Sequence, residues 1–108
     1  MLITDGVLVE YHNNVIAHIL NRSRFQDVLG FGLVPVHTTL STAGWNSVTT
    51  AGRLDQLLSA SGAPGRIGIT KGRTVYRTHG RELPFDQLYI GPDEIYARNG
   101  NATTRVDY

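Results

Sequence analysis

The residues best suited to binding a ligand are cations between positions 66 and 81. This stretch carries five Lys or Arg residues and no Asp or Glu. If Val75 faces the core, residues 73 and 77 share its face of a strand near the rim, and Tyr76 points to solvent. Tyr76 could then stack on a base while the arginines hold phosphates. The predicted binding residues are Arg66, Lys71, Arg73, Tyr76, Arg77 and Arg81. The alternative is a solvated edge strand whose charges deter aggregation.

A second candidate is an anion site at the start of a predicted helix. Thr49, Thr50 and Arg53 would place two hydroxyls and a guanidinium beside the free amides of the first turn, which attract anions. The alternative is structural: Trp45 anchors the start of the helix, and the threonine pair caps it.

Other kinds of chemistry find little support in the sequence. There is no cysteine, which excludes disulfides, thiolate zinc sites and thiol catalysis. The four histidines are scattered, whereas a zinc site needs at least three well-placed ligands. No Gly-x-Ser-x-Gly elbow or Gly-x-x-x-x-Gly-Lys-Ser/Thr loop is present. We therefore expect no catalytic residue, no metal and no cofactor.

The length and the charge distribution limit the number of domains and the kinds of protein that this chain can be. A chain of 108 residues is predicted to form a single domain over 1–108, with an ordered core over 6–97 and a mobile tail over 98–108. The net charge of +1 hides a basic middle, because residues 22–81 carry eight cations against two acids. No Lys or Arg precedes Glu10, so no signal peptide is expected, and no apolar run could span a membrane.

The elements that must position these residues are mainly strands. Eleven Thr, nine Val and seven Ile favour them because β-branched side chains pack well on a pleated sheet. The spacing of Ala51, Leu54 and Leu58 predicts one helix over Thr49–Ser61. The fold class is therefore α+β: a small, mainly antiparallel sheet of four to six strands packed on one central helix. Strands are expected over 7–11, 15–20, 33–40, 66–70 and 73–78.

The secondary structure of two regions is less clear from the sequence. Residues 21–32 could form a short helical turn or a mobile loop, since Phe25, Val28 and Leu29 have helical spacing. Residues 83–90 offer at most one more short strand. Pro35 predicts an edge strand or a break, because proline cannot donate a hydrogen bond to a neighbouring strand.

The block from Trp45 to Gln56 resembles a pattern in small bacteriophage proteins, which carry a Gly-Trp, a Thr-Thr pair and then an Arg followed by an apolar residue. Asp55 stands where those proteins usually have Asn, and 22–35 has the look of an insertion. The resemblance implies a phage source and a shared fold, and it implies no catalytic residue. Further matches are Asn14-Val15-Ile16-Ala17, Lys71-Gly72 and Pro84-Phe85-Asp86.

We therefore expect a small binding module, not an enzyme, that acts in the cytoplasm of an infected host cell. It would engage nucleic acid or an acidic host protein through residues 66–81, which are predicted to form a β-hairpin and which we call the basic hairpin, in an accessory or anti-defence role. The alternative is a structural or assembly protein of the virion that oligomerises through a sheet edge.

Overall fold

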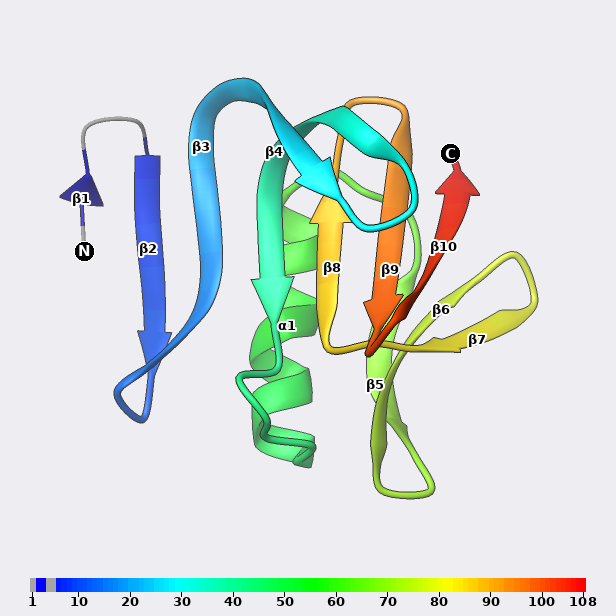
Figure 1. The fold of residues 1–108 in the computed structure, drawn as a ribbon. Coiled ribbons are helices and arrows are strands. Elements are labelled where there is room, and N and C mark those ends of the chain that lie inside the picture. Colours follow the sequence, from blue (N-terminus) through cyan, green and yellow to red (C-terminus); the bar gives the residue numbers. More distant parts are fainter. Residues whose placement is uncertain (1, 4–5) are drawn as a thin grey trace.

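The chain forms two antiparallel sheets and one α-helix in the part that the structure, a computed structural model, describes, residues 2–3 and 6–108 (Figure 1). The large sheet has the strand order β1-β2-β3-β4-β8-β9-β10. Its strands are β1 (Leu2–Ile3), β2 (Gly6–Tyr11), β3 (Asn14–Val28), β4 (Gly32–Ser41), β8 (Gln87–Ile90), β9 (Glu94–Asn99) and β10 (Ala102–Asp107). The small sheet consists of β5 (Arg66–Thr70), β6 (Arg73–Thr78) and β7 (Arg81–Pro84).

The predicted helix is confirmed as α1, which spans Val48–Ala60. Ser47 is its N-cap, and the Ser47 hydroxyl accepts a hydrogen bond from the backbone N–H of Thr50 at 3.2 Å. The helix ends at Ser61, after which Gly62 adopts a positive φ of 81°, a conformation that glycine reaches without strain.

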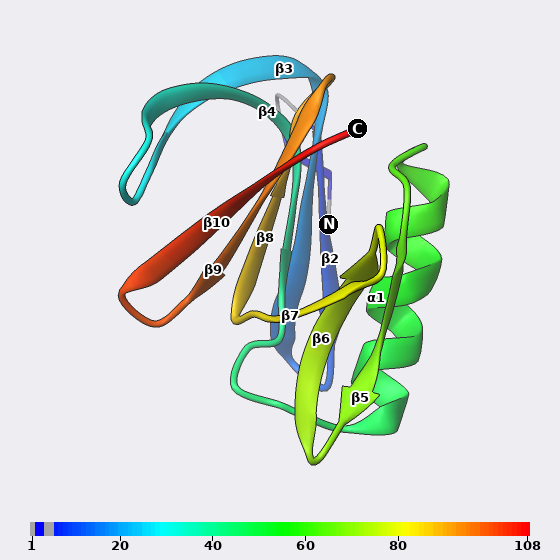
Figure 2. The same cartoon turned by 90° about the vertical axis from the view of Figure 1, so that its right-hand side faces the viewer.

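Helix α1 and the small sheet lie on the same side of the large sheet (Figure 2). The main core fills the space between these layers. Leu54 and Leu58 of α1, Leu88 of the large sheet and Tyr76 of the small sheet are all fully buried there. The α+β class is thus confirmed.

The opposite side of the large sheet is covered by a hairpin arm, which we define as residues 21–36 of β3 and β4. The pairing of the two strands shifts register between Ile19 and Arg24, so β3 carries more residues than β4 in this interval and the ribbon bends. Figure 2 shows the arm curling over the sheet. Its inward side buries Val28, Val34 and Val36 against Tyr89 and Tyr96, which forms a second, smaller core.

Helix α1 and the small sheet are inserted between two neighbouring strands of the large sheet, β4 and β8. The insertion begins and ends at one point, where the backbone N–H of Thr42 donates to the carbonyl of Asp86 at 3.0 Å. Ser41 pairs with Gln87 directly beside this bond. The two halves of the large sheet therefore join through segments far apart in the sequence.

Several details of the sequence-based prediction are wrong. Residues 21–28 continue β3 instead of forming a helical turn or a loop, because their partner in β4 lets them pair as a ribbon. Residues 102–107 form β10 on β9 instead of a mobile tail, and Val106 of β10 is buried in the main core. Residues 81–84 and 87–90 form two strands, not one. The large sheet accordingly has more strands than the four to six expected.

Other expectations concern the arm and the ends of the chain. Pro35 lies in a part of β4 that pairs only with β3, as expected for an edge position. No helix within residues 2–3 and 6–108 is long and apolar enough to cross a bilayer. The prediction that residues 1–10 are not a signal peptide rests partly on Asp5, which lies outside the described residues.

Candidate interaction site

The basic hairpin is confirmed as β5 and β6, but its arginines face acidic partners. Arg66 makes a bidentate contact with Asp55 of α1, with Nε 3.0 Å from Oδ1 and Nη2 2.9 Å from Oδ2. These hydrogen bonds from Arg66 hold the pKa of the Asp55 carboxyl below its usual value. Asp55 Oδ1 also accepts the backbone N–H of Ile67 at 2.8 Å. Arg66 thus helps to join the helix to β5.

Arg77 lies across its own sheet. Its Nε is 2.7 Å from Glu82 Oε2, and its Nη2 donates to Thr70 Oγ1 at 2.7 Å. The hydrogen bond from Arg77 lowers the pKa of the Glu82 carboxyl. The guanidinium passes over Gly68, where a Cβ atom would come within 2.4 Å of Arg77 Nη1. The charge of Arg77 is therefore largely balanced within the molecule.

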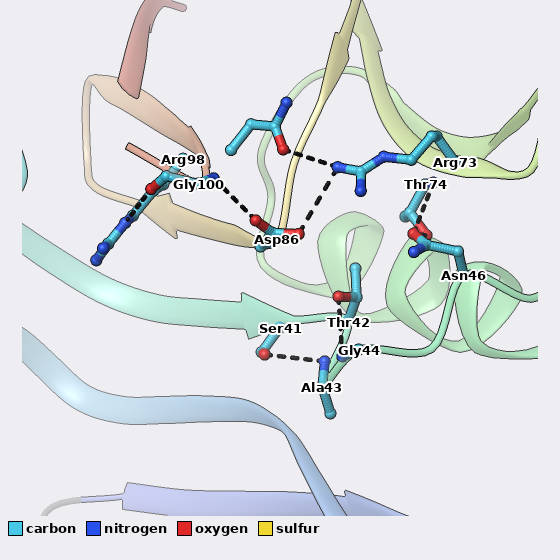
Figure 3. A network of polar contacts seen from close by, with 11 residues as sticks. Ser41, Thr42, Ala43, Gly44, Asn46, Arg73, Thr74, Asp86, Arg98 and Gly100 are labelled. Carbon is cyan, nitrogen blue, oxygen red and sulfur yellow. Dashed lines mark hydrogen bonds and ion pairs between the residues drawn. The ribbon is translucent and has the colours of Figure 1, made fainter. Parts of the chain in front are cut away.

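Arg73 belongs to a polar junction at the base of the inserted layer (Figure 3). Its Nη2 donates to Asn99 Oδ1 at 2.7 Å and lies 3.7 Å from Asp86 Oδ1. The other oxygen of Asp86 accepts the backbone N–H of Gly100 at 2.9 Å. A hollow of about 420 Å³ opens beside this junction. Because the side chains of Arg73 and Asp86 bond within the molecule, we interpret the junction as a structural link between the two sheets.

Tyr76 cannot stack on a base, so this part of the prediction is wrong. Its side chain is fully buried, and its hydroxyl donates to the carbonyl of Pro64 at 2.7 Å. Burial raises the pKa of the Tyr76 hydroxyl. The middle strand β6 is covered on both faces, since Val75 is buried as well as Tyr76.

Two of the predicted cations, Lys71 and Arg81, are exposed, and their side chains make no polar contact with the described part of the chain. Lys71 lies in the turn between β5 and β6, and Arg81 begins β7 at the other end of β6. The structure therefore does not bring the six predicted residues together on one free basic surface.

The residues of the predicted anion site are also separated. Thr50 is buried, and its Oγ1 accepts a hydrogen bond from the Ser47 hydroxyl at 3.0 Å. Thr49 is exposed and lines one hollow, whereas Arg53 lines the neighbouring hollow along the helix. The Arg53 guanidinium instead lies over the ring of Tyr11, 5.3 Å from its centroid. Trp45 does not anchor the helix in the core, because 57% of it is exposed.

The arm displays an apolar outer face that sequence analysis missed. Phe25 pairs with Pro35, and Asp27 pairs with Leu33, so these four side chains share the face that points away from the sheet. Phe25 is 72% exposed and Leu33 is 69% exposed. The apolar run 33–36 indicates a strand, but residues 21–32 lack the alternation of apolar and polar residues that would have predicted its partner.

A second apolar feature lies at the other end of the molecule. Tyr11, His12, Ile16, Trp45 and Thr49 surround a hollow of about 430 Å³ between the β2–β3 turn and the start of α1. The rings of Tyr11 and His12 lie 4.2 Å apart, centroid to centroid. A neighbouring hollow of about 460 Å³ continues along α1 and shares Tyr11 and Ile16 with the first. We call the two together the aromatic groove.

Comparison with protein-family models, with curated proteins and with solved structures finds no match. The exposed arm and the aromatic groove are therefore interpreted from their own geometry.

Proposed function

We propose that this chain is a structural or assembly protein that associates through the outer face of its arm. The observation that carries the proposal is the pair of exposed side chains Phe25 and Leu33 on one face of an otherwise well-packed ribbon. Large exposed apolar surfaces on small proteins commonly mark sites of protein contact. In the phage setting that the resemblance implies, the assembly would be a virion.

The arm is well suited to this role because its other face is fixed. Val28, Val34 and Val36 are buried, and the Phe31 ring packs edge-on against Tyr96 with centroids 5.0 Å apart. A ribbon held in place in this way loses little conformational freedom on binding. Burying a Phe or Leu side chain completely contributes about 1.5–3 kcal/mol, which an assembly contact can use.

The outer face of the arm supports association better than the β10 edge of the large sheet. The edge strand β10 carries Arg105, whose Nε lies 3.4 Å from Glu94 and 3.5 Å from Asp107. Charged side chains on an edge strand oppose pairing with another sheet. Binding of nucleic acid or an acidic host protein through the basic hairpin has less support, since Arg66, Arg73 and Arg77 already face carboxylates.

The test is the mass of the protein in solution, measured by light scattering after gel filtration. We expect the parent chain to form a species larger than a monomer at protein concentrations from about 1 μM to 1 mM, the range of moderate to weak association. The double substitution Phe25→Ser with Leu33→Ser should give a folded monomer. The control is Val48→Ser, which removes another exposed apolar side chain (78% exposed) away from the arm. A monomeric parent, or an arm variant that still assembles, would overturn the proposal.

A further inference from the structure

The molecule has two unpartnered apolar features at opposite ends of the large sheet. The arm lies at one end, and the β2–β3 turn and the start of α1 lie at the other, in both views (Figures 1 and 2). Resting on the proposed function, we infer that the arm of one copy docks in the aromatic groove of a second copy. The occupant of the groove is thus the apolar ribbon of Phe25, Leu33 and Pro35.

The shapes of the two features are complementary. The arm is a projecting two-stranded ribbon, and Phe25 and Leu33 stand out from its exposed face. The groove is elongated, because its two hollows share Tyr11 and Ile16 and run from Trp45 along the side of α1. Hollows of this size accept large side chains, and aromatic walls suit a phenyl ring.

In the described part of the chain, each feature carries an unpaired charge that can complement the other, and the groove wall also includes the acidic Glu10. Asp27 is exposed on the outer face of the arm, directly across from Leu33. Arg53 is exposed on the wall of the groove, where it lies over Tyr11. Neither side chain has a partner of opposite charge within the described residues. A docked arm can therefore place the carboxylate of Asp27 near the guanidinium of Arg53, which gives the contact a direction.

This contact joins two different surfaces, so it has a consequence that an arm-to-arm contact lacks. Each copy offers one arm and one groove, and a copy that lacks one of them can still use the other. An arm-deficient chain and a groove-deficient chain should therefore bind each other once, although neither can assemble by itself.

The experiment is a mixing test followed by light scattering. The arm variant is Phe25→Ser with Leu33→Ser, and the groove variant is Trp45→Ser, a substitution at an exposed position that leaves the core intact. Each variant alone should be monomeric, and an equimolar mixture should give a two-chain particle. The control Val48→Ser lies at the same end of the molecule but does not line the groove, and it should assemble as the parent does. Circular dichroism and thermal unfolding confirm that each variant is folded.

The outcomes separate this inference from the proposed function. If the arm variant is monomeric but the groove variant assembles, the arm is the assembly surface and its place of docking is not the groove. If both variants are monomeric and the mixture stays monomeric, the arm-to-groove contact is likewise refuted. If the parent is monomeric or the arm variant still assembles, both proposals fail.

A charge exchange provides an independent test of the same contact. Asp27→Arg and Arg53→Asp should each weaken assembly, because each places like charges across the contact. The two substitutions combined in one chain should restore assembly at the original salt concentration, and added salt should reduce the differences. Combined substitutions that assemble no better than either one alone would refute the pairing of Asp27 with Arg53.

Discussion

Asp55 and Arg66 form a two-point ion pair that joins α1 to the first residue of β5. The pair itself lies near the surface, since the Arg66 side chain is 77% exposed. The Asp55 carboxylate also accepts the backbone N–H of Ile67, a buried residue of the main core. The carboxylate therefore has one partner in solvent and one at the edge of the core.

Removal of this carboxylate should destabilise the fold more than removal of its charged partner. In Asp55→Ala the backbone N–H of Ile67 loses its acceptor, which should cost about 1–3 kcal/mol. In Arg66→Ala only an exposed ion pair is lost, which should cost less than about 1 kcal/mol. Urea unfolding of the two variants measures both losses. Equal losses would show that the ion pair, not the amide contact, holds the helix to β5.

The Asp55 carboxylate should also make the free energy of unfolding depend on pH. Because its pKa is lower in the folded protein than in the unfolded chain, its contacts stabilise the fold fully above the unfolded pKa of about 3.9. That stabilisation disappears as the pH falls through the lower folded pKa. Asp55→Asn should be less stable than the parent at neutral pH and should lose less stability between pH 5 and 2. Unfolding curves recorded across this pH range test the expectation, and parallel curves for the two proteins would contradict it.

Gly52 in the first half of α1 offers a stabilising substitution. A Cβ atom built at Gly52 meets no heavy atom within 4 Å, so no packing requirement for glycine exists within the described residues. Gly52→Ala should raise the free energy of unfolding by about 0.5–1 kcal/mol. The matched control is Gly62→Ala, which is also uncrowded but has a φ of +81° and should destabilise by roughly 1–2 kcal/mol. Thermal unfolding compares the two variants. A Gly52→Ala protein less stable than the parent would show that position 52 does require glycine.

Retention of nucleic acid should be weak. A surface that neutralises many phosphates shows affinity that falls steeply with salt. In the basic hairpin, the described residues leave only Lys71 and Arg81 without a carboxylate partner, and these two lie at opposite ends of β6. A mobility-shift titration with single-stranded DNA and RNA should therefore show little binding at about 0.15 M salt. Tight, salt-sensitive retention that is lost in Arg73→Glu with Arg77→Glu, with the fold intact, would instead support the hairpin as a binding site.

The sequence predicted the elements whose signals are local. The helix followed from the apolar spacing of Ala51, Leu54 and Leu58, and strands β5 and β6 followed from the extended runs on either side of Lys71-Gly72. The arm could not be predicted in this way, because residues 21–28 are mostly polar on both sides of the strand and therefore show no alternation of apolar and polar residues. Their strand conformation depends on pairing with β4 and on the contact of Val28 with Tyr89 and Tyr96.

The candidate site was harder to predict for a similar reason. Charge counts placed Arg66, Arg73 and Arg77 on one hairpin, but their partners Asp55, Asp86 and Glu82 come from three other segments. Likewise, Tyr76 alternates with Val75 as a two-faced strand would, and only the inserted layer as a whole shows that both faces of β6 are covered. Long-range neighbours decide these features, and one sequence does not record them.

The insertion of α1 and the small sheet between β4 and β8 has a consequence for synthesis on the ribosome. Strand β4 leaves the ribosome well before β8, its partner on one side, has been made. Until then, β4 lacks its β8 partner, and its side chain Leu40, which belongs to the main core, is not yet covered. An unpaired strand edge can pair with strands of other chains. The yield of folded protein in the cell should therefore depend on how fast translation proceeds from Thr42 to Asp86 and on chaperones that cover β4 in the meantime.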